Sequence, residues 1–218
     1  MNVAEFLNLN TELPNTEFQF KQYGKINDTV VIGLHGWTGD EHSLIPVSIG
    51  VMLHNSLWIF PRAPFNARKI SKGYSWFDRK PKSKMEVLET IHIIKKIVDS
   101  IHDRMGKNVK IFLLGFSQGA TFSTAAGLII RNKINGIVSI AGFLSKKNVE
   151  MLNIEPIGFS LPMLILHGTK DQVVPVESGI ESMEICKELG CDVVMKIYDE
   201  KHKIPVAAMK FIREFMTK

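Results

Sequence analysis

The sequence predicts an α/β fold, in which a mostly parallel central sheet carries helices on both faces. Two observations predict this fold class. Short runs of Val, Ile, Leu and Phe alternate along the chain with longer stretches of helical periodicity, which is the order of strand–helix–strand units. The short runs are continuously apolar instead of alternating with polar residues, as expected for strands that helices cover on both sides.

Six of these runs are the predicted strands of the sheet, and a seventh, residues 18–23, is expected to add an antiparallel strand at one edge. The six lie at residues 30–34, 57–60, 111–114, 136–140, 163–166 and 193–198. Four stretches with apolar residues at helical spacing separate them, at residues 85–104, 118–131, 176–189 and 205–216. The stretch 118–131 is rich in small residues.

Residues 1–218 are expected to form a single domain, because this length suits one hydrophobic core. The segment 61–84 shows no clear periodicity, and a loop of this length inside a compact domain is usually functional. Its aromatic residues favour packing over disorder, so we expect a long loop near the active site.

The composition is that of an ordinary globular protein, with 45% hydrophobic and 22% charged residues. The net charge is +5, but Lys and Arg form no dense run, so we expect no nucleic-acid partner. Two cysteines, Cys186 and Cys191, are too few for a disulfide framework and are expected to face different directions. Without a signal-peptide pattern or an apolar stretch of 18 residues, the expected location is cytoplasmic, with no stable membrane insertion.

The most informative motif is Gly115-Phe116-Ser117-Gln118-Gly119, between a predicted strand and a predicted helix. In this G-x-S-x-G pattern the serine occupies a sharp turn that exposes its hydroxyl, and the glycines leave room for the turn. The backbone N–H of Gln118 opens the helix and is free to bind a developing oxyanion. The motif predicts an α/β-hydrolase fold with Ser117 as the nucleophile.

A serine nucleophile needs a general base that an acid holds in place, and in this fold the chain order is serine, acid, histidine. Asp171 follows the predicted strand 163–166, at the sheet edge where sites of parallel sheets collect. His202 is the only histidine after Asp171. Asp199 and Glu200 are alternative acids, but they adjoin the histidine and could not easily reach its far nitrogen.

A second oxyanion donor is expected from the glycine-flanked turn 35–40, where we nominate the backbone N–H of Trp37. His167 precedes a glycine at a strand end and is interpreted as a structural histidine bonded to loop backbone. A metal site formed by His35, His42 and His167 is an alternative, but their spacing matches no known ligand pattern.

These residues resemble the phospholipase/carboxylesterase family of α/β-hydrolases, which includes acyl-protein thioesterases, lysophospholipases and related carboxylesterases. The resemblance runs from about residue 29 to residue 215 and rests on five blocks in the right order. The blocks are Leu34-His35-Gly36 with Gly39-Asp40, Pro61-Arg62-Ala63-Pro64, Ser75-Trp76-Phe77-Asp78, Gly115-Phe116-Ser117-Gln118-Gly119, and His167-Gly168 with Asp171, Val174-Pro175, His202 and Pro205. Two departures are Lys201, where glycine is common in the family, and a basic segment with Arg68, Lys69 and Lys72.

The resemblance implies a single domain without a large cap. It also implies a serine hydrolase that cleaves carboxylic esters or thioesters through an acyl-enzyme on Ser117, without a cofactor or metal. The implied triad is Ser117, Asp171 and His202, with Trp37 and Gln118 as oxyanion donors. The expected partner is a small-molecule acyl ester or thioester, bound by a monomer or homodimer. The residues expected to bind this substrate are Trp76, Phe77, Phe143, Leu144 and Val174.

Three alternatives were weighed against this interpretation. Dienelactone-type hydrolases of small esters or lactones usually have cysteine at the position of Ser117. Prolyl peptidases usually carry a large additional domain. A non-catalytic binding module would have lost a member of the triad, whereas all three residues are present. The sequence leaves phospholipids, acyl-proteins and small esters all open as substrates.

Overall fold

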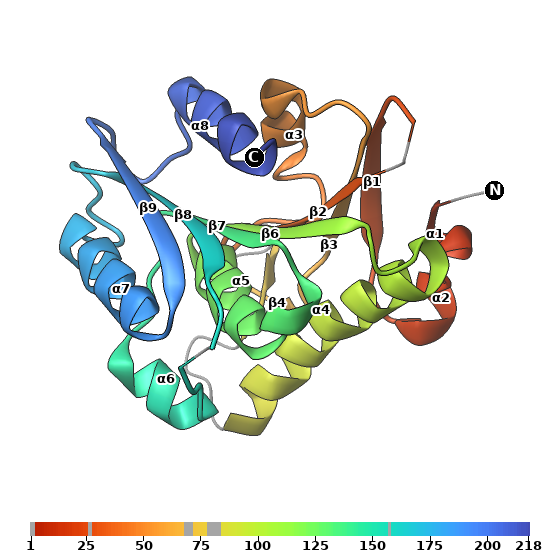
Figure 1. Cartoon of the computed structure of the whole chain (residues 1–218), viewed down its shortest axis with the longest axis horizontal. Helices are drawn as coiled ribbons and strands as arrows, with labels where there is room; N and C mark the ends of the chain where they lie inside the picture. The colour runs from red at the N-terminus through yellow and green to blue at the C-terminus, as the bar shows by residue number, and fades with distance from the viewer. Residues whose placement is uncertain (1–2, 26–27, 68–71, 78–83, 157) are drawn as a thin grey trace.

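The computed structural model describes residues 3–25, 28–67, 72–77, 84–156 and 158–218, and a seven-stranded sheet forms its centre (Figure 1). The strands lie in the order β1-β3-β2-β6-β7-β8-β9. Their bounds are Phe18–Tyr23 (β1), Ser56–Pro61 (β3), Thr29–Leu34 (β2), Lys110–Phe116 (β6), Gly136–Ile140 (β7), Leu161–Gly168 (β8) and Cys191–Tyr198 (β9). All neighbours pair in parallel except β1, which runs antiparallel to β3 at the edge.

Helices cover both faces of the sheet, and Figure 1 shows α3 and α8 on one side and α4, α5 and α7 on the other. These helices span Ile45–Val51 (α3), Lys84–Met105 (α4), Gln118–Ile129 (α5), Val176–Glu188 (α7) and Val206–Met216 (α8). Strand β6 shows why its sequence is continuously apolar. Ile111 and Leu113 pack in the core under α4, α5 and α7, whereas Phe112 and Leu114 pack in the core under α3 and α8.

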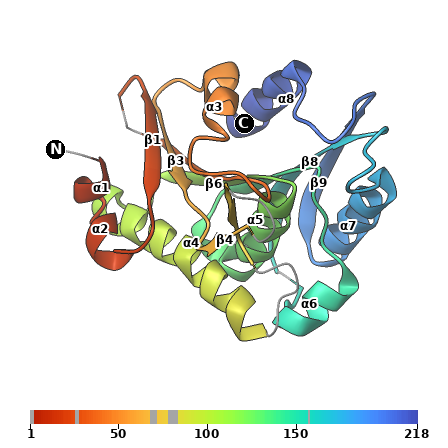
Figure 2. The same cartoon turned by 180° about the vertical axis from the view of Figure 1, so that it is seen from behind.

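All seven predicted strands and all four predicted helices are present, so the predicted fold class is confirmed. The sequence did not predict α1 (Val3–Phe6), α2 (Leu9–Glu12), α3, α6 (Lys146–Leu152) or the 3-10 turn Arg131–Lys133. These helices have at most seven residues, which is too short for a periodic pattern. Helices α1 and α2 lie beside β1 at the sheet edge, as the reverse view shows (Figure 2).

The predicted long loop contains two short strands, β4 (Phe65–Asn66) and β5 (Tyr74–Ser75), which pair antiparallel. Within this segment, Arg68, Lys69 and Asp78 lie outside the described residues. None of the described helices is long and apolar enough to cross a lipid bilayer.

The prediction that the two cysteines face different directions is wrong. Cys186 and Cys191 are both buried, and a hydrogen bond joins their side chains. The chain turns at Gly190, which has a φ of 95°, and this turn folds the start of β9 back against the end of α7. The turn was not visible as a change in apolar periodicity.

Candidate active site

The site lies at the carboxyl ends of four parallel strands. Ser117 follows β6, the turn with Trp37 follows β2, Asp171 follows β8 and His202 follows β9. Parallel strands bring their carboxyl ends to one edge of the sheet, and the residues there converge. The structure therefore brings together four groups that are as much as 165 residues apart in the sequence, from Trp37 to His202.

Ser117 stands on the sharp turn that the motif predicts, with φ 54° and ψ −118°. Such a conformation costs a non-glycine residue about 1–3 kcal/mol, and the surroundings must hold it. The N–H of Ser117 donates to Ile140 O at 2.8 Å. The motif glycines allow neighbouring backbone to approach: a Cβ on Gly119 would lie 2.1 Å from Leu34 O, and one on Gly115 would lie 2.2 Å from Gly119 O.

Substituting Gly119 with alanine is therefore expected to destabilise the protein by about 3 kcal/mol or more, because the new Cβ meets backbone that cannot rotate away. The matched control is Gly158→Ala, since a Cβ at Gly158 would meet nothing within 4 Å. Urea unfolding followed by circular dichroism measures both free energies. Equal stability of the two variants would contradict the close packing of α5 on β2.

A continuous chain of hydrogen bonds joins Asp171, His202 and Ser117. The Nδ1 of His202 lies 2.6 Å from Asp171 Oδ2, and its Nε2 lies 2.9 Å from Ser117 Oγ. A carboxylate can only accept, so Nδ1 carries the proton and Nε2 is free to accept from the serine hydroxyl. The ring of Phe116 packs against the imidazole with centroids 5.0 Å apart. The distances are those of a nucleophile, a base and the acid that orients it.

The environment of Asp171 keeps it ionised. Burial alone would raise its pKa, but the hydrogen bonds from His202 and from the N–H groups of Val174 and Val173 more than offset burial, and the pKa lies below its ordinary value. Both N–H groups donate to Oδ1, at 2.8 and 2.9 Å, which leaves Oδ2 for His202. An anion beside Nδ1 is suited to stabilise an imidazolium.

The alternative acids have other partners. Asp199 pairs with Lys170 at 2.7 Å, and Glu200 pairs with Lys203 at 2.8 Å. The loops that carry Asp171 and His202 are themselves joined, because Lys170 N donates to Glu200 O at 2.9 Å. Among the described residues, Asp171 is the carboxylate that contacts the imidazole of His202, and neither alternative does.

His167 makes the backbone contact that the sequence suggested, since its Nε2 donates to Val174 O at 2.8 Å. The ring is fully buried, and its Nδ1 has no hydrogen-bond partner within the described part of the chain. The three histidines of the alternative metal site serve separate contacts. His35 accepts from Ala63 N, and His42 lies 3.4 Å from Glu41.

Two backbone N–H groups beside Ser117 are unpaired. Neither Trp37 N nor Gln118 N has a hydrogen-bond partner among the residues that the structure describes. The turn with Trp37 packs directly against Ser117, because a Cβ on Gly36 would lie 3.4 Å from Ser117 Cβ. Unpaired donors next to a nucleophile are what an oxyanion hole requires.

Residues 74–77 form hydrogen bonds to both segments that carry the unpaired N–H groups of Trp37 and Gln118. Thr38 N donates to Tyr74 O at 3.0 Å, and Tyr74 N donates to Gly39 O at 2.8 Å. On the other side, the side-chain Oε1 of Gln118 accepts from Trp76 N at 2.8 Å. The short segment thus bridges the turn after β2 and the first residue of α5.

Trp76 occupies a different place from the one expected for a residue that binds substrate. Its side chain is fully buried, and its Nε1 donates to His35 O at 2.8 Å. The hydroxyl of Thr90 donates to Trp76 O at 2.9 Å. The indole packs against His35 in the turn 35–40, whereas the neighbouring Phe77 lines a cavity beside Ser117.

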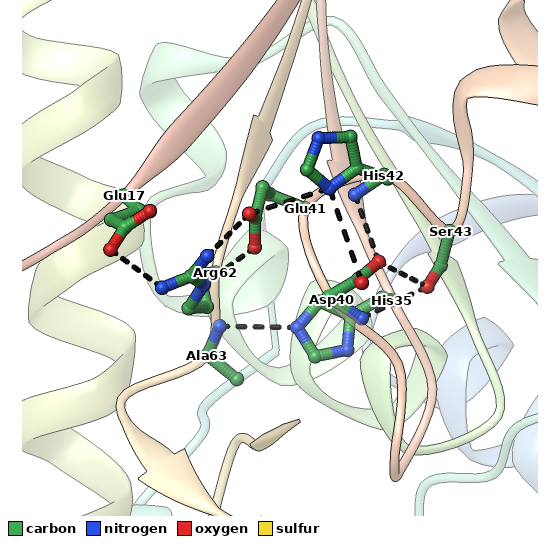
Figure 3. A network of polar contacts seen from close by, with 8 residues as sticks. All are labelled: Glu17, His35, Asp40, Glu41, His42, Ser43, Arg62 and Ala63. Atoms are coloured by element: carbon green, nitrogen blue, oxygen red, sulfur yellow. Dashed lines mark hydrogen bonds and ion pairs between the residues drawn. The ribbon is translucent and has the colours of Figure 1, made fainter. Parts of the chain in front are cut away.

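An ion-pair network that the sequence did not reveal holds the same turn (Figure 3). Arg62 donates to both carboxylate oxygens of Glu41, at 2.5 and 2.6 Å, and also pairs with Glu17 at 2.6 Å. Its guanidinium lies 4.5 Å above the ring of Tyr74. The hydrogen bonds from Arg62 hold the pKa of Glu41 below its ordinary value. One arginine therefore connects the residue before β1, the residue after the turn 35–40, and Tyr74.

A mostly apolar cavity of about 510 Å³ opens beside Ser117. Four of the five residues expected to bind substrate line it: Phe77, Phe143, Leu144 and Val174. Helices α4, α5 and α6 supply further lining residues that the sequence analysis missed, namely Val87, Thr121, Phe122, Ala125, Lys147, Asn148, Met151 and Leu152. Helical periodicity indicated buried faces of α4 and α5 but gave no sign that part of these faces borders a cavity.

The chain was compared with known proteins. The family model described as Phospholipase/Carboxylesterase matches residues 16–218. Acyl-protein thioesterase 1 of Candida albicans is 31% identical over 186 residues, covering 77% of this chain and 80% of that protein. Carboxylesterase SOBER1 of Arabidopsis thaliana is 26% identical over 203 residues, covering 86% and 89%.

Solved structures agree with the observed fold. The crystal structure of SOBER1 from Arabidopsis thaliana matches with a TM-score of 0.74 and 25% identity over 87% of this chain and 98% of that one. The crystal structure of esterase PE8 matches with a TM-score of 0.77 at 21% identity, over 93% and 98%.

Proposed function

We propose that Ser117, Asp171 and His202 are the catalytic triad of this chain, which belongs to the phospholipase/carboxylesterase family and is a serine hydrolase of esters or thioesters. The observation that carries this proposal is the hydrogen-bond chain from Asp171 through His202 to Ser117, at 2.6 and 2.9 Å. We assign the described part of residues 1–218 to one catalytic domain, with the segment 61–84 beside the site.

In the proposed mechanism, His202 takes the hydroxyl proton as Ser117 Oγ attacks the acyl carbon, and Asp171 stabilises the imidazolium. The carbonyl oxygen becomes an oxyanion that the N–H groups of Trp37 and Gln118 bind, each worth about 3–4 kcal/mol in the transition state. His202 then returns the proton to the leaving oxygen or sulfur, and the acyl group stays on Ser117. Water releases the acyl group by the reverse sequence.

The cavity beside Ser117 is the proposed site of the acyl group. Its volume of about 510 Å³ lies within the usual range for small-molecule sites, and its lining is mostly apolar. Phe77, Phe143 and Leu144 would contact the chain, with Val174 closing the side next to Asp171. An apolar cavity of this kind favours a fatty acyl group over a peptide, which also has to hydrogen-bond its backbone.

Labelling with a fluorophosphonate tests the proposal directly, because this reagent phosphonylates only a serine that a neighbouring base activates. We expect stoichiometric labelling of the folded chain, on the tryptic peptide that contains Ser117. His202→Ala removes the base and should lower the labelling rate at least about a thousandfold. Labelling elsewhere, or equal labelling of the variant, would contradict the assignment of the triad.

A further inference from the structure

A second cavity, of about 350 Å³, adjoins His202. Its lining includes Trp37, Leu44, Phe116, Lys203 and Ile204. The proposed acyl cavity reaches Ser117 but not His202, and the second cavity reaches His202 but not Ser117. The hydrogen bond between these two side chains therefore joins two separate cavities.

Proton transfer decides which part of the substrate each cavity takes. The imidazole that accepts the proton from Ser117 must return it to the leaving oxygen or sulfur, so the leaving group has to lie on the side of His202. The acyl group occupies the other side, in the cavity that reaches Ser117. This step rests on the function proposed above.

We infer that the cavity adjoining His202 is the site of the leaving group and that it takes an uncharged, apolar alcohol or thiol packed against the indole of Trp37. When the acyl-enzyme forms, the bond from the acyl carbon to the leaving oxygen or sulfur breaks as the bond to Ser117 Oγ forms. The proton that His202 took from the serine goes to the departing atom, which leaves as a neutral alcohol or thiol.

The lining of the second cavity explains why an apolar group is favoured. Trp37 lines this cavity and has 42% of its surface exposed, an unusual exposure for so large an aromatic side chain. Two of the polar side chains in the lining have partners of their own, although Lys203 stays largely exposed. Ser43 both donates to and accepts from Asp40, at 2.9 Å, and Lys203 pairs with Glu200 at 2.8 Å.

The apolar side chains in the lining are Leu44, Phe116 and Ile204 together with the indole, and Gly36, Thr38 and Gly39 of the turn complete it. A cationic head group would be attracted by an exposed indole, but here it would also meet the ammonium group of Lys203. The cavity therefore selects against cations and in favour of flat apolar groups.

The test compares benzyl hexanoate with ethyl hexanoate, which share the acyl group and release alcohols of similar acidity. We expect the kcat/KM of the wild type to be about tenfold higher for the benzyl ester, the scale of one aromatic contact. Trp37→Ala keeps the backbone N–H but should reduce this ratio to within about twofold of unity. Choline hexanoate should be a poorer substrate than ethyl hexanoate.

The control is Phe143→Ala, which alters the acyl cavity. It should change the ratio of hexanoate to acetate hydrolysis and leave the benzyl-to-ethyl ratio unchanged. Should Trp37→Ala fail to fold, Ile204→Ala changes the same cavity and should also lower the benzyl-to-ethyl ratio. A ratio near unity in the wild type, an unchanged ratio in Trp37→Ala, or preference for choline hexanoate overturns the inference. Hydrolysis of neither hexanoate would instead contradict the proposed function.

Discussion

Replacing Ser117 with alanine is expected to lower kcat for hydrolysis of a p-nitrophenyl ester by about a millionfold. The variant keeps the oxyanion donors and both cavities but has no oxygen to attack the acyl carbon. Some acceleration over water should survive, about a thousandfold, because donors and binding groups act without the nucleophile. Spectrophotometry of nitrophenolate release measures the loss.

The control is Ser123→Ala, on the same helix as the elbow. Ser123 is fully buried, and its hydroxyl donates to Ala120 O at 3.0 Å, so its loss leaves no unpaired donor. We expect its activity to stay within about threefold of the wild type. Adding His202→Ala to Ser117→Ala should cost little more, since the three residues act as one unit. An active Ser117→Ala variant would exclude the serine mechanism.

The strands of the sheet could be predicted from the sequence because they are buried on both faces. In β6, each residue from Ile111 to Leu114 contacts one of two cores, so the whole run is apolar and recognisable. Helix α3 was missed for the opposite reason. It has seven residues, a proline in its first turn and no side-chain cap, and none of these features distinguishes it from a loop.

The three residues of the proposed triad could be nominated from the sequence because chemistry and topology constrain them together. The fold sets their chain order, and only His202 follows Asp171. The ion pairs that hold the neighbouring turn 35–40 could not be predicted. Arg62 and Glu41 are 21 residues apart and look like ordinary surface charges, yet Glu41 is only 3% exposed.

The sequence also did not show which of two adjacent residues in the irregular segment 74–77 faces the core and which faces the cavity. The side chain of Trp76 points into the core against the turn 35–40, whereas Phe77 borders the proposed acyl cavity. A helix or strand has a period that separates inward from outward positions, but residues 74–77 have none. The inward position of Trp76 follows from its hydrogen bonds to His35 and Gln118, which the sequence does not display.

The change Asp171→Asn is expected to lower kcat by about ten-thousandfold without unfolding the protein. The reason lies in the hydrogen bonds of this side chain. The N–H groups of Val173 and Val174 both donate to Oδ1, so an asparagine should keep its oxygen there and turn its amide NH₂ toward His202. An NH₂ group donates, which forces Nδ1 of His202 to accept and moves the imidazole proton to Nε2.

In that tautomer, the nitrogen that faces Ser117 carries a proton and cannot take another, so the base is lost while the geometry survives. The matched control is Asp199→Asn, which makes the same chemical change in a neighbouring carboxylate that pairs with Lys170 and not with the imidazole. We expect kcat of the control to stay within about twofold of the wild type, since exposed ion pairs contribute little. If Asp199→Asn were the variant that lost activity, or if Asp171→Asn lost less than about tenfold, the acid would have been assigned wrongly. Because both variants remove one negative charge from neighbouring loops, a change in overall charge cannot account for a difference between them.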